Sequence, residues 1–366
     1  MNGAAAARAL AHRGTNVIGF DRYTPPHALG SSHGETRILR TAYFEHPMYV
    51  PLVQDALGRW LSLARTSGRA LFRQTGGLSI GDADGALVSG VIKSINTHGL
   101  PHEVLPARDL RSRYPALEPP PGAIGVLEPD AGALAAEDCV VALLEDASSA
   151  GATLRFDEAV TGWREQKGGV LIETSRGTTE TDALVLCVGP WLSRFAAVRE
   201  LGLTVERQVV FWYALEGAAD GLPVVIWEAS EDALLYAIPG PGSRVKAALH
   251  HGGEIVDPDT VDRVASEVDE ARVAELLGRL MPQALRRPAV AHSVCLYTNT
   301  PDWDFLLDRM PGEEHVYIMS ACSGHGFKFA PAMGELIADL ILDERPRPDL
   351  EPFHTERLRP NQRALD

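Results

Sequence analysis

One lysine lies inside a glycine-rich turn near the C-terminal end of the sequence. The turn, Ser323-Gly324-His325-Gly326-Phe327-Lys328-Phe329, follows the apolar run 316–320 and precedes a second apolar stretch that opens with Pro331. The pattern predicts a strand, a tight turn and a helix with proline in its first turn. Such a turn brings backbone N–H groups close to a ligand, with a helix N-terminus behind them. The pattern fits a plain strand-to-helix connection with an incidental Lys328 equally well.

Two arginines form a second unusual group. Arg37 and Arg40 lie three residues apart in the polar, glycine-bearing segment 30–43. In a helix they would share a face, although a solvated surface pair is the usual situation for arginine. Because the neighbouring residues are small or apolar, we expect the segment not to be free in solvent. Two further segments, 246–251 and 295–297, also carry unusual polar residues.

The N-terminal segment has the pattern of the second half of a dinucleotide-binding unit. An alanine-rich helix over 4–13, a short buried strand over 16–20 and then Asp21 are predicted. In a complete unit a strand and a G-x-G-x-x-G turn come first, and an acidic residue about 20 residues later holds a ribose hydroxyl. Only Gly3, 18 residues before Asp21, could belong to that turn. An ordinary helix and strand explain the segment about as well.

The remaining pattern predicts two kinds of region. Helices are expected over 49–64, 85–97, 137–149 and 261–280, and strands over 78–80, 153–156, 170–174 and 183–188. The apolar runs 209–215, 224–227, 234–238 and 244–249 follow one another without helices, which predicts an antiparallel sheet. We therefore predict an α/β plus α+β fold, in which a Rossmann-like nucleotide-binding domain (1–77, 132–207 and 298–366) is interrupted by an antiparallel-sheet substrate domain (78–131 and 208–297).

Composition narrows the classes of protein. The chain has 366 residues and 45% hydrophobic content, which suits a globular protein of two or more domains or layers. No apolar run approaches the length of a membrane helix, and the first 14 residues lack the pattern of a signal peptide. The net charge of −15 argues against nucleic acid and acidic membranes as partners. Its four cysteines lack CxxC spacing, so no metal site or disulfide framework is expected, and a cytoplasmic location is the default.

Several unusual strings, in matching order and spacing, resemble the monomeric sarcosine oxidase and N-methyltryptophan oxidase family. They are GSSHGETRILRTAY (30–43), VKAALHHGG with DPDT (245–260), VCLYTNTPDWDFLLD (294–308) and SGHGFKF (323–329). Weaker matches, such as DRYTPPH (21–27) and LVLCVGPW (184–191), extend the likeness almost end to end. The resemblance implies an FAD-dependent enzyme, active as a monomer, that oxidises a secondary amino acid to an imine and passes the electrons to O2.

The resemblance also implies roles for individual residues. Cys295 matches the cysteine that joins the flavin 8α-methyl group through a thioether, a step that needs a thiolate. Arg40 and Lys328 match the pair that holds the substrate carboxylate, the first as a fork and the second as a point charge. Lys246 matches the lysine that promotes reaction with O2. The alternatives without a function in the chemistry are that Cys295 is a small buried core residue and that Lys246 lies at a sheet edge.

Other matches complete the implied site. His250 matches a histidine near the substrate, although a structural histidine is the commoner case, and Tyr236 and Tyr297 match tyrosines of the same pocket. Arg37 and His33 match positions near the flavin ring, where Arg37 would stabilise negative charge. His251 has no assigned role. The residues expected to bind the cofactor are Cys295, Gly3, Asp21, His33, Gly189, Gly324, Gly326 and Lys328.

Two departures from the family pattern stand out. The first strand and the first two glycines of the dinucleotide-binding unit have no counterpart here, which is explained either by a start placed too far downstream or by a short chain that binds FAD poorly. An alternative function follows, namely a protein that keeps the fold as a binding or scaffold protein without FAD. Trp227 stands near the expected substrate wall; it is either a sign of a substrate bulkier or flatter than sarcosine or, as we prefer, a plain core residue.

Overall fold

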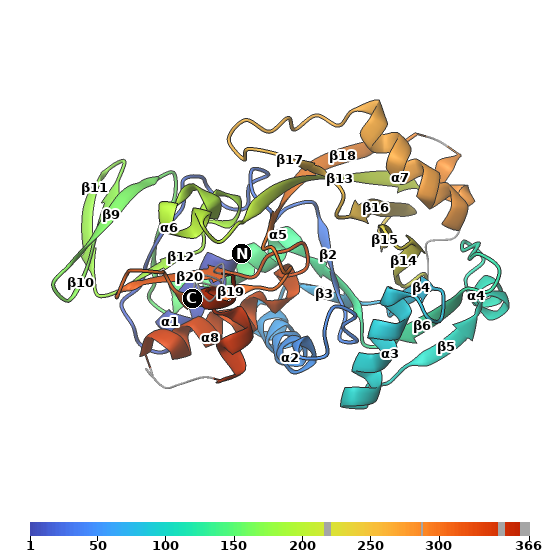
Figure 1. The fold of residues 1–366 in the computed structure, drawn as a ribbon, viewed down its shortest axis with the longest axis horizontal. Coiled ribbons are helices and arrows are strands. Elements are labelled where there is room, and N and C mark those ends of the chain that lie inside the picture. Colours follow the sequence, from blue (N-terminus) through green and yellow to red (C-terminus); the bar gives the residue numbers. More distant parts are fainter. Residues whose placement is uncertain (216–220, 287, 343–347, 359–366) are drawn as a thin grey trace, which may run out of the picture.

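The computed structural model describes residues 1–215, 221–286, 288–342 and 348–358. One large sheet dominates the right half of the molecule in Figure 1, and several small sheets with helices α1, α2, α5 and α8 make up the other half. The arrangement is the mixed α/β and α+β fold predicted from the sequence. The proposed division into two discontinuous domains stays a prediction.

The large sheet is mainly antiparallel. Its strand order is β17-β13-β16-β15-β14-β4-β6-β5, and β18 also pairs with β13. Only β14 and β4 run parallel to each other. The strands are β4 (Gly77–Gly81), β5 (Glu103–Pro106), β6 (Ile124–Glu128), β13 (Thr204–Ala214), β14 (Val224–Ser230), β15 (Ala233–Gly240), β16 (Arg244–His250), β17 (Glu254–Ile255) and β18 (Ala291–Asn299).

Three helices accompany this sheet, namely α3 (Ala86–His98), α4 (Ala107–Arg113) and α7 (Glu267–Leu280), with the short 3-10 turn η2 (Pro282–Leu285) after α7. The prediction that α7 begins at residue 261 is wrong. Ser266 caps the helix by accepting a hydrogen bond from the backbone of Asp269, whose side chain accepts from the Ser266 backbone in return. This capping box fixes the helix start, although Val261 and Ala265 still pack against the core of the sheet.

The Rossmann-like half contains two separate parallel pairs. Strand β1 (Ile18–Phe20) pairs with β8 (Thr153–Arg155), and β12 (Leu184–Leu186) pairs with β20 (Val316–Ser320), which in turn pairs antiparallel with β19 (Leu306–Arg309). Among the described residues, neither β1 nor β12 has a partner on its other edge. The parallel strands therefore form two separate sheets in the described structure.

Helices α1 (Asn2–His12), α2 (Tyr49–Ser67), α5 (Ala136–Ser149) and α8 (Ala330–Leu342) belong to this half, and α1 packs against α5 and α8. Pro331 lies in the first turn of α8, as predicted. The smaller elements are the sheet β2 (Thr36–Leu39), β3 (Phe72–Gln74) and β7 (Gly132–Ala135), the meander β9 (Val160–Gln166), β10 (Gly169–Thr174) and β11 (Gly177–Thr181), helix α6 (Ala196–Arg199), and the 3-10 turns η1 (Gly189–Arg194), η3 (Phe327–Phe329), η4 (Pro348–Phe353) and η5 (Thr355–Leu358).

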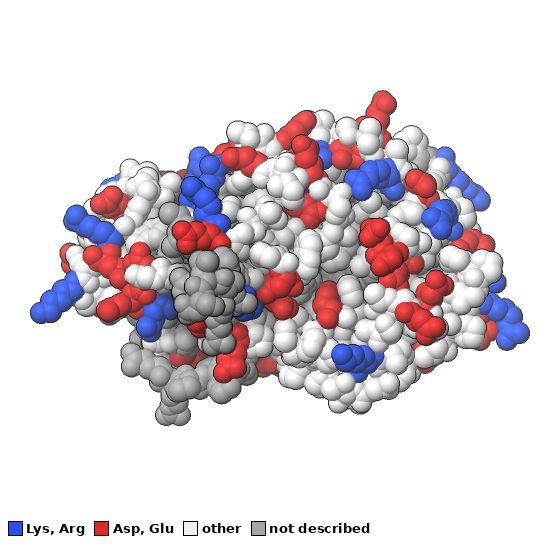
Figure 2. All heavy atoms as spheres, viewed as in Figure 1, with Lys and Arg blue, Asp and Glu red and all other residues white. Residues whose placement is uncertain are grey.

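The described ranges show how charged side chains and cysteines are distributed. On the face shown in Figure 2, Lys and Arg side chains stand in small groups among acidic ones. Within those ranges no helix is long and apolar enough to cross a membrane. All four cysteines are free, and no group of His, Cys, Asp and Glu in the described part of the chain is arranged to hold a metal ion.

Candidate active site

A cavity of about 1340 Å³ connects the two halves of the molecule. At one end it is lined by Gly3, Asp21 and Gly189, and at the other by the polar residues singled out in the sequence, which are Arg37, Arg40, Tyr236, Lys246, His250, Cys295, Tyr297, Gly324, Gly326 and Lys328. Such pockets usually measure roughly 300–1,000 Å³. The cavity therefore has room for a dinucleotide and a small substrate together.

The Cys295 thiol lies on β18 in a positively charged corner. Its Sγ is 3.6 Å from Arg37 Nη2 and 3.8 Å from His33 Nε2, and the residue is 3% exposed. Burial alone would raise the pKa of this thiol, but the nearby Arg37 and His33 lower it to about 6. A thiol with that pKa is largely a thiolate at neutral pH and can act as a nucleophile. His33, the one predicted residue that does not line the cavity, lies behind this sulfur.

Arg37 and Lys246 are held by backbone carbonyls of the same loop. Lys246 Nζ donates to the Gly34 oxygen at 2.8 Å and to the Thr36 oxygen at 2.5 Å, while Arg37 donates to the oxygens of Thr36 and Ser31. Strand β16 lies between β13 and β15, so the alternative of a sheet-edge Lys246 is wrong. Burial, reinforced by Arg37, lowers the pKa of Lys246 to about 7.

Lys328 reaches the cavity from η3, the turn that the sequence predicted. Its Nζ donates to the His325 oxygen at 2.6 Å and to the Tyr43 hydroxyl at 3.1 Å. Burial, reinforced by the charge of Arg40, lowers the pKa of Lys328 to about 7. Two buried lysines thus stand in one cavity at positions where an anionic group would stabilise their charged forms.

Arg40 follows β2 and is 6% exposed, with its guanidinium over the rings of Tyr43 and Phe44. The expectation that the segment is not free in solvent is confirmed. Both Oε atoms of Glu45 lie 2.7 Å from Arg40 Nη2. Burial opposes ionisation of Glu45, but Arg40 outweighs it and the pKa of Glu45 falls below its usual value.

The glycines of the turn are required by packing. Gly324 has a φ of +77°, and a Cβ added there would lie 2.5 Å from the Tyr297 ring and 2.9 Å from His250 Cε1. A Cβ on Gly326 would lie 2.2 Å from the Ala321 oxygen. Both contacts are far inside normal van der Waals distance, so these two positions accept only glycine. The turn can therefore lie directly against the wall that carries His250 and Tyr297.

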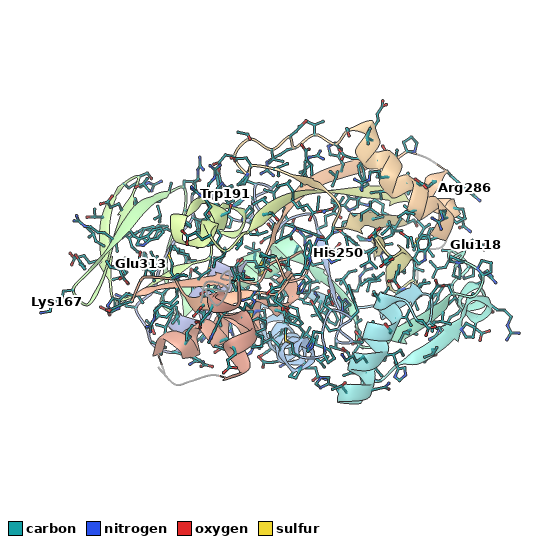
Figure 3. All side chains as sticks on the ribbon, in the orientation of Figure 1. Glu118, Lys167, Trp191, His250, Arg286 and Glu313 are labelled. Atoms are coloured by element: carbon teal, nitrogen blue, oxygen red, sulfur yellow. The ribbon has the colours of Figure 1, made fainter. Side chains whose placement is uncertain are left out.

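Tyr236 and Tyr297 stand on β15 and β18, and burial raises the pKa of both hydroxyls, which stay protonated at neutral pH. His250 ends β16, and Figure 3 labels it near the middle of the molecule. Trp227 is 1% exposed and packs in the core on the opposite face of its strand, so the interpretation as a plain core residue is confirmed. Its neighbour Ile226 lines the cavity instead.

Sequence reasoning missed several polar residues around the lysine-bearing turn. His325 Nε2 donates to the Trp303 oxygen at 3.0 Å, and its Nδ1 accepts from the Tyr43 hydroxyl at 2.7 Å. Burial lowers the pKa of His325 to about 4, so its imidazole is uncharged at neutral pH. His325 was visible within the glycine turn, but no sequence signal connected it to Tyr43 or Glu45, which lie about 280 positions earlier.

The end of the cavity that is lined by Gly3, Asp21 and Gly189 contains the helix and strand predicted from the sequence. Gly3 lies in the first turn of α1, and a Cβ there would lie 3.3 Å from Cys187 Cβ, so glycine allows close packing of the helix on the residue that follows β12. That is one of the functions of glycine in dinucleotide-binding turns. Asp21 follows β1 and accepts a hydrogen bond from the Tyr23 backbone. The open edges of β1 and β12 also face this end.

These residues fit FAD at both ends of the cavity. The reactive thiol and the buried cations suit an electron-accepting ring system, while a helix N-terminus and an acid after a strand suit a pyrophosphate and a ribose.

Comparison with known proteins agrees with this geometry. The family model described as FAD dependent oxidoreductase matches residues 1–340. The chain is 35% identical to a monomeric sarcosine oxidase of Streptomyces avermitilis, over 93% of this chain and 91% of the relative. It is 33% identical to an N-methyl-L-tryptophan oxidase of Salmonella arizonae, over 97% of this chain and 96% of the relative.

Solved structures show the same fold. The open form of NikD, an amino acid oxidase of nikkomycin biosynthesis, matches with a TM-score of 0.83 and 26% identity, over 96% of this chain and 94% of that one. An L-proline dehydrogenase from P. horikoshii matches in fold with a TM-score of 0.84 at 20% identity, over 97% of this chain and 94% of that one. The chain therefore belongs to the family of FAD-dependent oxidoreductases.

Proposed function

We propose that this chain is a flavin-dependent oxidase of secondary amino acids, either N-methylated or cyclic, that releases hydrogen peroxide. The observation that carries the proposal is the shared cavity, in which the Cys295 thiol and Lys246 stand together with the pair Arg40 and Lys328. FAD, when bound, accepts a hydride equivalent from the amino acid, which becomes an imine, and passes the two electrons to O2. The substrates of the relatives named above support this class.

Arg40 and Lys328 are the proposed carboxylate-binding residues. The guanidinium already holds a carboxylate, that of Glu45, through two contacts of 2.7 Å. A substrate carboxylate therefore competes with Glu45 for the charge of Arg40, and a second cation nearby at Lys328 favours its binding. Holding the carboxylate in this way fixes the position of the neighbouring amine and carbon.

Cys295 is the proposed site of covalent attachment. Its thiolate is the nucleophile, and Arg37 keeps that charge stable in a buried place. Attachment would join this sulfur to the flavin methyl carbon with loss of two protons and two electrons, for which O2 would be the acceptor and hydrogen peroxide the product. Lys246, a buried cation 2% exposed, is the proposed residue that stabilises negative charge developing on O2.

The experiment that tests this function measures hydrogen peroxide release from the FAD-loaded protein. The panel contains N-methyl and cyclic secondary amino acids, and each is compared with its carboxamide. We expect peroxide with at least one acid and far less with its amide, because the amide lacks the negative charge that Arg40 and Lys328 bind. Equal rates with acid and amide would reject the carboxylate site.

One observation favours a second candidate, a binding or scaffold protein without FAD. Strands β1 and β12, which line the end of the cavity with Gly3 and Asp21, have open edges in the described structure. Titration of the purified protein with FAD separates the two candidates. Uptake of about one FAD per chain supports the oxidase, and failure to take up FAD supports the second candidate.

A further inference from the structure

Glu206 is a buried acid that has no part in the proposed chemistry. It lies on β13, directly opposite Tyr297 of β18, and is 3% exposed. Its Oε1 accepts from Gln208 Nε2 at 2.6 Å and from the Gly253 N–H at 2.5 Å, and its Oε2 accepts from Asn299 Nδ2 at 2.7 Å. Burial works against its charge, but the hydrogen bonds to it lower the pKa of Glu206, which is therefore ionised.

The fourth partner of this carboxylate is His251. Its Nδ1 lies 3.3 Å from Glu206 Oε2, and its backbone has a φ of +69°, in the left-handed region that costs a non-glycine residue energy. The ring centroid of His251 lies 4.1 Å from that of His250 and 4.3 Å from that of Trp303. Glu206 and Trp303 thus hold the His251 ring against the back of His250.

The ring of His250 itself is held in place by van der Waals contacts with its neighbours. Among the described residues, neither nitrogen of its ring has a hydrogen-bond partner, although the ring lines the cavity. His251 covers one side, and Tyr297 and the Cβ-free backbone of Gly324 stand close by, with the Tyr297 centroid 5.8 Å away. Both ring nitrogens therefore remain available to a bound molecule.

We propose that Glu206 and His251 are positioning residues that set the orientation and charge of the His250 imidazole as the hydrogen-bond partner of the substrate. The proposal rests on the proposed function, because it assigns the substrate to the same cavity. Three features act together on the position of His250. They are the strained backbone of His251, the fully hydrogen-bonded carboxylate of Glu206, and the contacts of the His251 ring with the rings of His250 and Trp303. That convergence distinguishes the arrangement from an ordinary core histidine.

The charges around His250 come from several elements. His251 follows it directly after β16, Arg40 faces it from the loop after β2, His325 and Lys328 from the glycine turn, and Tyr297 from β18. The two nearby carboxylates pair with these groups, Glu45 with Arg40 and Glu206 with His251. Burial lowers the pKa of His250 well below its usual value, and the charges of His251, His325, Arg40 and Lys328 lower it further. A variant without the His251 imidazole should therefore have a higher His250 pKa.

The test compares His251→Phe, which keeps a ring, with Glu206→Gln. The readout is the ¹³Cε1 resonance of His250 in protein labelled at histidine, assigned with His250→Asn and followed against pH without FAD or substrate. We expect the His250 resonance to move in both variants and its pKa to rise in His251→Phe. The matched controls His292→Phe and Glu228→Gln, on the same sheet but away from the cavity, should leave the resonance in place.

Kinetics on the FAD-loaded protein supply the second readout. Misplacing His250 should lower kcat/KM roughly ten- to hundredfold, the scale seen when a group in contact with the substrate shifts by up to an ångström. The loss should be greatest at acidic pH in His251→Phe, because His250 then protonates at higher pH. A purely structural role would lower activity evenly across pH.

If His251→Phe does not fold, His251→Asn replaces it, since asparagine tolerates the left-handed backbone but has no ring. An unchanged His250 resonance in a folded variant at either position would overturn the proposal. This readout needs no substrate, so it still decides the matter if the protein proves not to be an oxidase of amino acids.

Discussion

Arg40 and Glu45 form a close ion pair at the wall of the candidate active-site cavity, with both carboxylate oxygens 2.7 Å from one guanidinium nitrogen. The pair leaves Arg40 neutralised by the protein's own carboxylate. Burial strengthens such a pair when the geometry is good, because the surrounding medium screens the charges less than water does. Any carboxylate that binds Arg40 must therefore compete with Glu45.

Glu45→Gln should relieve that competition. We expect a small carboxylate such as acetate to bind about tenfold more tightly to the variant, or about 1.4 kcal/mol, close to the net value of one hydrogen bond to a charged group. Competition against the oxidase reaction, or a titration monitored by flavin absorbance, measures the change. Asp55→Asn removes an exposed carboxylate on α2 and serves as the control. Weaker acetate binding in Glu45→Gln would mean that Glu45 orients Arg40 rather than competing for it.

Cys295→Ser should leave the flavin dissociable. In the unchanged protein we expect the yellow colour to remain in the acid-precipitated pellet, and in the variant to pass to the supernatant. The matched control is Cys322→Ser, because Cys322 also lines the cavity but burial raises its pKa, so it is not a nucleophile at neutral pH.

The rate of covalent attachment should follow ionisation of the same thiol. Since the pKa of Cys295 is about 6, the thiolate fraction, and with it the rate, should rise as the pH increases through about 6 and level off above it. A colour that stays with the pellet of Cys295→Ser would place the attachment elsewhere.

Lys246→Met should slow the reaction of the reduced enzyme with O2 by roughly a hundredfold, the usual scale for loss of one preorganised charge. Reduction by substrate should change far less, and stopped-flow absorbance separates the two half-reactions. Because the pKa of Lys246 is about 7, its charge is present below that pH, so the O2 reaction should slow as the pH rises past about 7. Lys93→Met, on α3, is the control; equal slowing of both half-reactions in Lys246→Met would remove Lys246 from this function.

Lys328→Met should stabilise the FAD-free protein while impairing substrate binding. A lysine whose pKa is 10.5 when unfolded and about 7 when folded favours the unfolded state whenever the unfolded chain binds its proton. The penalty is complete below about pH 7, on the order of a few kcal/mol, and fades as the pH approaches 10.5. Thermal unfolding should thus show the largest gain in Tm at or below pH 7 and a smaller one near pH 10. A gain in Tm that is the same at both pH values would contradict a lowered pKa of Lys328.

The glycine turn and the N-terminal helix show what the sequence can predict. Their glycine, proline and apolar spacing depends on local backbone geometry, so the strand, turn and helix around Lys328 appear where expected. Five strands of the large sheet, β4, β13, β14, β15 and β16, were also predicted, whereas β5, β6, β17 and β18 were not. The face of each strand that meets the cavity was not predicted either. Trp227 and Ile226 alternate on β14, and only the packing shows that Ile226 is the one that lines the cavity.

Contacts between residues far apart in the chain could not be predicted from the sequence. The contact of Tyr43 with His325 and that of Glu206 with His251 join elements far apart in the chain, and no spacing rule connects them. The start of α7 was misplaced for a similar reason, because the apolar pattern continues through residues 261–265 although the helix begins only after Ser266. Such features depend on tertiary packing, which overrides local pattern.

The most direct test of the central claim is anaerobic reduction of the FAD-loaded protein by a secondary amino acid. We predict that at least one N-methyl or cyclic secondary amino acid bleaches the visible flavin absorbance without O2, and that admitting air restores the colour with about one equivalent of hydrogen peroxide. Arg40→Ala should need a much higher concentration of the same compound. Absorbance that stays unchanged with every member of the panel would contradict the account.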